Sequence, residues 1–161
     1  MELFDVINKR FSNRKFLEKQ IGNEDLDRIL KAGMQAPVGR GRYEDMHITV
    51  IQDKNLLDEI NKLVDRSVFY NAPTLVIISA KDDGHGLDKE NSACVAMNML
   101  LAATDLGLAS IYLNLVIGLI KNSDILNKLN LPLGFVPIVG VGLGYADGSH
   151  ITEHKIDVNY I

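Results

Sequence analysis

The 161-residue sequence has one cysteine, four prolines and no tryptophan, and it lacks long hydrophobic runs. The single cysteine, Cys94, cannot form an internal disulfide or a CxxC motif, and the apolar stretch around it, residues 93–103, favours a small core residue. The apolar run at residues 72–80 is much shorter than the about 20 residues that cross a bilayer, and the start MELFDVINKR has no cationic segment leading into an apolar one. We therefore expect no membrane partner and a cytoplasmic protein.

The chain also lacks an excess of positive charge. It carries 17 basic and 21 acidic residues, for a formal net charge of −4, so we expect no nucleic-acid partner. The four histidines form no HExxH motif and no pair at metal-ligand spacing, and no metal site is predicted. With 47% hydrophobic residues, a chain of this length can bury a sizeable core, which predicts one domain over residues 1–161.

Hydrophobic periodicity predicts an alternation of helices and strands. The expected helices are residues 3–10, 24–35, 54–66, 89–106 and 123–129; the expected strands are residues 46–52, 74–80, 108–113 and 136–145, followed by an extended tail at 151–161. Asn23 and Asp53 are predicted N-caps, and Gly107 should end the helix before it. That helix is apolar nearly all round between residues 93 and 103, which predicts burial inside the protein or between two copies of it.

The most informative segment is KRFSNRKF, residues 9–16, which is too charged to be core. If it is extended, a period of two residues places Arg10, Ser12 and Arg14 on one side. Guanidinium groups pair bidentately with phosphate and keep their charge, so two of them around a hydroxyl suit an anionic, oxygen-rich ligand. The same residues also fit a solvated loop whose arginines cap the first helix or pair with nearby carboxylates.

Two other segments are rich in glycine. The stretch APVGRGRY at residues 36–43 follows a predicted helix, and its glycines would let the backbone approach a ligand closely. The stretch GVGLG at residues 140–144 is not followed by a helix, so it does not match a dinucleotide-binding fingerprint and favours a closely packed strand. Because no GxSxG motif or other strong protein nucleophile is present, a cofactor is the better candidate for carrying chemistry.

Taken in order, these segments resemble the FMN-dependent nitroreductase family, and the chain's length is similar to that of its compact members. The matching pieces cover nearly the whole chain; they are the RxSxR stretch at 10–14, residues 26–33 leading to Ala36-Pro37, the strand at 47–51, residues 98–103 and 106–108, and residues 142–145. The resemblance implies an α+β fold with a mixed, mainly antiparallel sheet flanked by helices. It also implies an intertwined homodimer with FMN bound in the interface.

The resemblance further implies which residues contact FMN. Arg10, Ser12 and Arg14 would contact the phosphate, ribityl chain and pyrimidine edge, the loop at 37–41 would reach the flavin of the other subunit, and the backbone at 113–115 would meet flavin N5. The full implied set is Arg10, Phe11, Ser12, Arg14, Pro37, Val38, Gly39, Gly41, Leu113, Asn114, Leu115 and Lys155, the last on the phosphate. Val38, Gly41 and Tyr43 stand where the family usually has Ser, Asn and Gln, so the loop would use its backbone.

The function implied is a flavin oxidoreductase. It would pass hydride from NADH or NADPH through FMN to an electron-poor small-molecule acceptor such as a nitroaromatic or a quinone. Alternatives on the same fold are reductive dehalogenation, flavin breakdown, or a non-catalytic FMN-binding or regulatory dimer.

Overall fold

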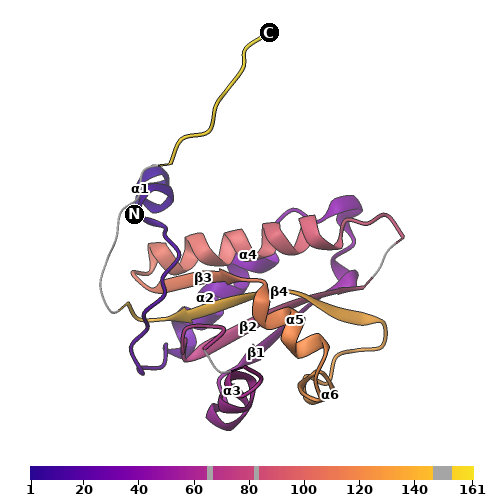
Figure 1. The fold of residues 1–161 in the computed structure, drawn as a ribbon. Coiled ribbons are helices and arrows are strands. Elements are labelled where there is room, and N and C mark those ends of the chain that lie inside the picture. The colour runs from indigo at the N-terminus through magenta and orange to yellow at the C-terminus, as the bar shows by residue number, and fades with distance from the viewer. Residues whose placement is uncertain (65–66, 82–83, 147–153) are drawn as a thin grey trace.

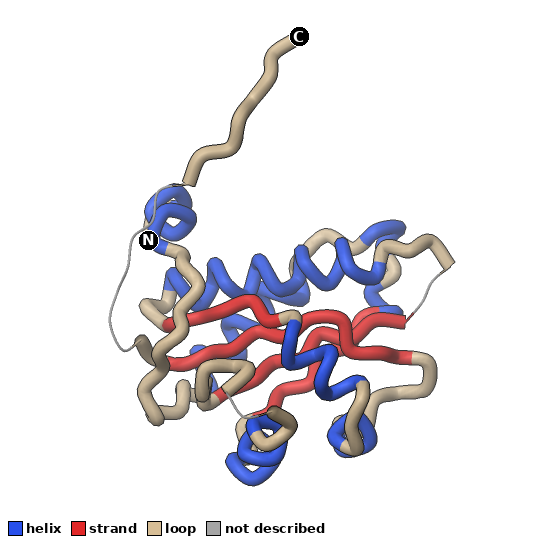
Figure 2. Tube along the Cα trace, in the orientation of Figure 1, coloured by secondary structure: helices blue, strands red, loops and turns tan. Residues whose placement is uncertain are grey.

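The computed structural model describes residues 1–64, 67–81, 84–146 and 154–161, and shows a sheet with helices on both faces (Figures 1 and 2). The helices are α1 (Leu3–Lys9), α2 (Asn23–Met34), α3 (Lys54–Asn61), α4 (Asp88–Asp105), α5 (Leu115–Lys121) and α6 (Ile125–Lys128). The strands are β1 (Met46–Ile51), β2 (Thr74–Lys81), β3 (Ala109–Leu113) and β4 (Phe135–Gly144). Short 3-10 turns lie at Gly39–Gly41 and Tyr43–Asp45.

The four strands form one sheet in the order β1-β2-β4-β3, and every neighbouring pair is antiparallel. A parallel pairing comes from outside the named strands, where Ser12 bridges to Ser110 of β3. The expected α+β fold with a mainly antiparallel sheet between helices is thus confirmed (Figure 2).

Strand β2 is buried on both faces, and its alternating side chains enter two separate cores. Val76 and Ile78 pack into the core beneath α2 and α4. Leu75 and Ile77 pack into the opposite core, which α3, α5 and α6 cover. Because successive strand residues point to opposite faces, a sheet covered on both sides needs the continuous apolar run that this strand has.

Strand β4 confirms the close packing predicted for GVGLG. Val139, Val141 and Leu143 face the α2–α4 core, and the glycines between them leave room on the other face. A Cβ at Gly142 would lie 3.0 Å from Ile111 Cγ2, and one at Gly144 would lie 2.8 Å from Pro73 Cδ. The glycines therefore let β3 and the chain before β2 approach the strand more closely than side chains would permit.

Several predicted boundaries are confirmed, and others are wrong. The Asp53 side chain caps α3 by accepting a hydrogen bond from Leu56 N at 2.8 Å, and Gly107 follows α4 with a φ of 73°. Asn23 is not a cap, because α2 already begins at that residue and Gly22 occupies the cap position. Helix α3 ends at Asn61, before the predicted end at 66, and residues 65–66 lie outside the described residues.

Helix α5 was not predicted. Its sequence LVIGLIK is rich in β-branched residues and resembles a strand, but Val116, Ile117 and Ile120 are buried on one helical face. Burial against the sheet therefore outweighs local propensity.

Apolar side chains also remain uncovered on the protein surface. Leu3 and Phe4 of α1 are 63% and 76% exposed, and Met97 of α4 is 46% exposed. The C-terminal residues 154–161 contain no helix or strand and point away from the sheet (Figure 1); residues 151–153 of the predicted tail lie outside the described part. Tyr160 in this tail is 90% exposed.

Candidate functional site

The RxSxR stretch runs in extended form along the edge of the sheet. Ser12 bridges to Ser110, and Asn13 N donates a hydrogen bond to Ser110 O at 3.0 Å. Asn13 is 3% exposed, whereas Ser12 is half-buried and Arg14 is exposed. The alternation predicted for an extended segment is confirmed for Ser12 and Arg14, which line the same pocket.

This pocket, which we call the β3 pocket, has a volume of about 250 Å³. It lies where β3 passes into α5, beside the RxSxR stretch. Its lining residues are Ser12, Arg14, Ser67, Val68, Tyr70, Ile111, Tyr112, Leu113, Asn114 and Leu115. Two segments assigned to the site from sequence, around residues 12–14 and 113–115, are therefore brought together although about one hundred residues separate them.

Sequence reasoning missed half of the pocket's lining. Ser67, Val68 and Tyr70 come from the loop before β2, and Tyr112 from β3. Burial raises the pKa of Tyr112, and its hydroxyl is protonated at neutral pH. Tyr112 pairs with Val141, whose side chain faces the α2–α4 core, so the Tyr112 side chain lies on the sheet face opposite Ile111 and Leu113. Strand β3 was predicted from sequence, but no sequence signal marked the loop.

Three aromatic residues in the loops have separate positions. Tyr70 lines the β3 pocket, and its ring centroid lies 5.9 Å from Arg14 Cζ. Phe69 is 1% exposed and belongs to the core. Tyr43 donates a hydrogen bond to Ala36 O at 3.3 Å and borders a different, more apolar pocket with Met34 and His47.

The loop at residues 37–45, between α2 and β1, forms a second candidate region. We call it the α4 loop because it is bound to the start of α4. Gly39 N donates to Asn91 Oδ1 at 2.9 Å, which fixes the loop to the first turns of α4. Arg40 and Gly41 have φ values of 60° and 65°, and Gly41 N donates to Val38 O at 2.9 Å. The turn therefore presents backbone outward, as its glycines predicted.

An ion pair holds the end of the α4 loop. Arg42 Nε lies 2.5 Å from Asp45 Oδ2, and Asp45 is 8% exposed. The hydrogen bond from the Arg42 guanidinium lowers the pKa of the Asp45 carboxyl, so the pair is fully charged at neutral pH.

The structure does not gather the whole predicted set in one chain. Pro37, Val38, Gly39 and Gly41 line no part of the β3 pocket, and neither do Arg10, Phe11 and Lys155. Arg10 is half-buried after α1, where its N–H donates to Val6 O at 2.9 Å. Lys155 is exposed in the C-terminal tail (Figure 1).

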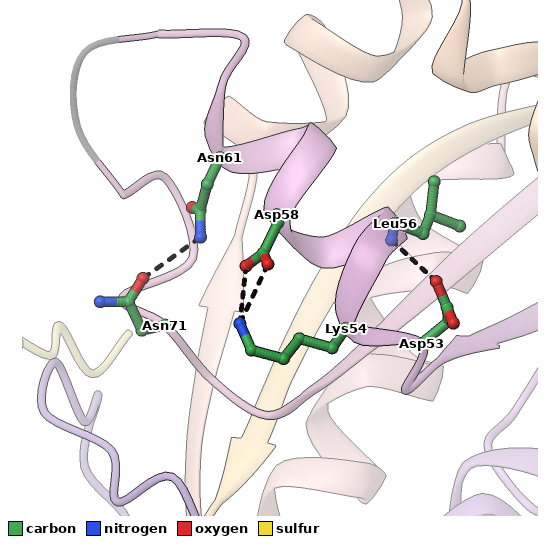
Figure 3. Close-up of polar contacts among 6 residues, drawn as sticks. All are labelled: Asp53, Lys54, Leu56, Asp58, Asn61 and Asn71. Carbon is green, nitrogen blue, oxygen red and sulfur yellow. Dashed lines mark hydrogen bonds and ion pairs between the residues drawn. The ribbon is translucent and has the colours of Figure 1, made fainter.

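A larger pocket of about 490 Å³ lies beside α3, and its polar groups pair mainly with one another. Lys54 Nζ contacts both oxygens of Asp58, and Asn61 Nδ2 donates to Asn71 Oδ1 at 3.2 Å (Figure 3). Gln20 donates to Pro73 O at 2.8 Å. Since this pocket contains none of the sequence-predicted residues, its size does not make it the better candidate.

Within the described residues, no three histidine, cysteine or carboxylate side chains are grouped so that they could hold a metal ion. No helix in the described ranges is both long and apolar enough to cross a bilayer.

Comparison with known proteins relates the whole chain to one family. The nitroreductase family matches residues 7–68 and 62–145. A protein of Archaeoglobus fulgidus with the provisional name NADH dehydrogenase/NAD(P)H nitroreductase is 30% identical over 149 residues, covering 89% of this chain and 85% of that protein.

Solved structures agree with this relation. A Bacteroides fragilis nitroreductase with bound FMN is 30% identical, with a TM-score of 0.86 over 100% of this chain and 97% of that one. An FMN-dependent nitroreductase from Clostridium difficile is 26% identical, with a TM-score of 0.84 over 99% of each chain. The resemblance seen in the sequence is confirmed, and the chain belongs to the nitroreductase family.

Proposed function

We propose that the protein is an FMN-dependent oxidoreductase that takes hydride from NADH or NADPH and reduces an electron-poor acceptor such as a nitroaromatic or a quinone. The observation that carries this proposal is the β3 pocket, where Ser12 and Arg14 meet residues 113–115 in a chain of the nitroreductase family. A related structure 30% identical to this chain contains FMN, which supports the choice of cofactor.

The β3 pocket has the chemistry that FMN requires. Arg14 offers a permanent positive charge, and the Ser12 hydroxyl offers hydrogen bonds to phosphate, ribityl or ring oxygens. Leu113 and Leu115 provide apolar wall for an aromatic ring system. FMN, when bound, supplies the redox chemistry by accepting hydride and passing it on.

The protein's own residues bind and orient rather than react. Arg14 places positive charge in the pocket, where it would favour an anionic ligand or a ring that becomes anionic on reduction. Arg10, the backbone of Phe11, and Lys155 belong to the proposed site as its outer contacts. None of the pocket-lining residues is a cysteine or a histidine that could act as a nucleophile or general base.

We further propose that the site is completed in a homodimer. The β3 pocket, at about 250 Å³, is smaller than the roughly 300–1,000 Å³ of most small-molecule sites. Four residues of the α4 loop line neither the β3 pocket nor the pocket that Tyr43 borders; they are Pro37, Val38, Gly39 and Gly41. A second copy that brings this loop to the β3 pocket would supply the missing wall.

Exposed apolar residues support the same assembly. Phe4 in α1 and Ile156, Val158 and Tyr160 in the tail are each at least 68% exposed. Such side chains at both ends of one chain are suited to cover a partner, and they would gain burial on dimerisation.

The first experiment is the visible absorption spectrum of the purified protein after addition of FMN and removal of the excess, followed by anaerobic NADH and NADPH. Retained flavin bands that bleach with either nucleotide are expected. Absence of retained flavin would contradict the proposal. If the retained flavin is reduced by dithionite but not by NADH or NADPH, the result would instead indicate a non-catalytic FMN-binding protein.

Sedimentation equilibrium of the FMN-loaded protein tests the dimer. We expect a mass near twice 17.8 kDa for the full chain and a weaker dimer when residues 155–161 are removed. A monomer at all concentrations would exclude the shared site. If the shortened protein dimerises as strongly as the full chain, the tail does not contribute to the interface, but the dimer itself stands.

A further inference from the structure

The loop before β2 contains an unusual backbone turn on the wall of the β3 pocket. Tyr70 and Asn71 are consecutive residues with φ values of 57° and 56°. Asparagine tolerates this left-handed conformation, whereas a bulky aromatic residue adopts it at a cost in free energy. A strained tyrosine persists only where the surroundings hold it.

Hydrogen bonds on both sides hold this turn in place. Asn71 N donates to Ser67 Oγ at 2.9 Å, and Ala72 N donates to Phe69 O at 3.1 Å. The Asn71 side chain in turn accepts from Asn61 of α3 (Figure 3). Phe69 and Ala72 are each 1% exposed, so the residues that flank the turn are fixed in the core.

The turn directs two neighbouring aromatic rings to different places. Phe69 enters the core and borders the larger pocket beside α3. Tyr70 remains 36% exposed and lines the β3 pocket. The strained backbone is therefore what delivers the Tyr70 ring into the pocket while Phe69 stays buried.

In the pocket, the Tyr70 ring lies beside the Arg14 guanidinium, at 5.9 Å from the ring centroid. A cation at this distance from an aromatic face is attracted by the ring quadrupole. Arg14 itself is exposed, and its hydrogen bond from Nη1 to the backbone oxygen of Ser12 is long at 3.4 Å. The Tyr70 ring is thus the side chain that restricts this flexible, exposed arginine.

We infer that Tyr70 is a positioning residue, which holds the Arg14 guanidinium in the β3 pocket so that it meets an anionic ligand in a fixed orientation. The ligand in question is the flavin of the proposed function, on which this inference rests. Less rotamer freedom is lost when a side chain is already restricted before the ligand arrives, so a pre-positioned arginine binds more tightly.

A double-mutant cycle on FMN affinity tests this role. Tyr70→Ala should raise the FMN dissociation constant about 2–5-fold, the range that corresponds to an exposed cation–π contact, whereas Tyr70→Phe should leave it unchanged because the ring remains. In an Arg14→Ala background, Tyr70→Ala should have no further effect. Equal weakening with and without Arg14 would overturn the inference, as would a Tyr70→Ala protein that binds FMN normally.

A measurement on the protein without flavin separates this inference from the proposed function. The mobility of the Arg14 side chain, measured by NMR as the order parameter of its Nε–Hε bond, should be restricted in the original protein and in Tyr70→Phe, and greater in Tyr70→Ala. Unchanged mobility of Arg14 in Tyr70→Ala would overturn the inference whether or not FMN binds. Mobility that responds as expected in a protein that retains no FMN would support the inferred arrangement and reject the flavin as the ligand.

Tyr70→Gly is the matched control for folding. It removes the same ring as Tyr70→Ala but tolerates the positive φ, so it should be the more stable of the two. Both variants should increase the mobility of the Arg14 side chain equally. A Tyr70→Gly protein in which Arg14 stays restricted would show that the backbone, not the ring, orients Arg14.

Discussion

The two candidate regions differ in how much of a site each contains. The β3 pocket joins segments from three parts of the chain, and it has a cation, hydroxyls and apolar walls around one cavity. The α4 loop is just as firmly held, by Asn91 at one end and by the Arg42–Asp45 pair at the other, but it lines no part of that cavity. The first region contains a cavity within the chain, whereas residues 37–41 of the second line neither this cavity nor the pocket that Tyr43 borders.

This difference agrees with the proposed site shared between two identical chains. The fold brings the RxSxR stretch and β3 together by direct strand pairing, which a single chain can do. Gly39 and Gly41 of the α4 loop offer backbone groups, which need a close approach by another surface before they bind anything. The following changes affect the two regions separately.

The largest effect is expected from Arg14→Ala in the β3 pocket. If Arg14 makes a charged hydrogen bond to FMN, its loss should weaken binding by about 1.5–3 kcal/mol, or roughly 10–150-fold. Arg10→Ala is expected to lie in the same range if Arg10 joins the site, although it does not line this pocket. Titration of flavin fluorescence or absorbance measures both.

Arg28→Ala is the control for these arginine variants, because Arg28 is an exposed arginine on α2 away from the pocket. It should change FMN affinity by less than about twofold. Unchanged affinity in both Arg10→Ala and Arg14→Ala would remove the RxSxR stretch from the site and leave the β3 pocket without its main cation.

The next effect concerns the packing behind the β3 pocket. Gly144→Ala should destabilise the fold by about 1–3 kcal/mol, because its Cβ would lie 2.8 Å from Pro73 Cδ, a rigid ring, and 2.9 Å from Phe16. Gly118→Ala in α5 meets nothing within 4 Å and should stabilise by roughly 0.5–1 kcal/mol as a better helix former. Urea unfolding of the two variants gives the comparison, and equal stability would contradict the close-packing argument.

Much of the fold could be predicted from sequence, because it depends on local pattern. The run at residues 75–78, LVII, is apolar without interruption, which is what a strand buried on both faces requires. Asp53 followed by apolar residues at helical spacing predicted a capped helix. Helix α5 could not be found in this way, because only tertiary burial decides between helix and strand for a short β-branched segment.

The site was predictable where it depends on sequence alternation and not where it depends on turns. Ser12 and Arg14 share a side of an extended segment, so spacing alone placed them together. Tyr70 reaches the pocket through a left-handed turn that its sequence disfavours, and no pattern identifies such a residue. In the proposed homodimer, the contact between the α4 loop and the β3 pocket depends on a second chain, which a single sequence does not describe.

A smaller effect should separate the α4 loop from the β3 pocket. Asn91→Ala removes the hydrogen bond to Gly39 N and should cost about 0.5–1.5 kcal/mol of stability. If the loop reaches the flavin of a second subunit, FMN affinity should fall several-fold as well, since the loop's backbone is no longer held. Thermal unfolding and FMN titration measure the two effects.

Asn98→Ala is the matched control on the same helix, because Asn98 Nδ2 donates to Ala32 O at 3.0 Å and does not touch the loop. It should cost similar stability but leave FMN affinity unchanged. If Asn91→Ala and Asn98→Ala bind FMN equally well, the α4 loop does not contribute to the FMN site. The loop would then have a structural role only, and the β3 pocket alone would be the candidate site.

The smallest effect is a pH dependence of the α4 loop, which comes from the Arg42–Asp45 pair. Because Arg42 lowers the pKa of Asp45 in the folded protein, the pair stabilises the fold at pH values above the carboxyl's ordinary pKa of 3.8 and loses this contribution as the pH falls through the lowered folded value. Asp45→Asn should therefore lower stability at neutral pH and make the curve of stability against pH flatter below about pH 4.

Asp105→Asn is the control, because it removes the ion pair with the N-terminal ammonium at the other end of α4. It should flatten the curve of stability against pH in the same acid range. Only Asp45→Asn should also weaken FMN binding at neutral pH, since only Asp45 holds the α4 loop; equal FMN affinity in the two variants would show that the loop's shape does not matter to the site.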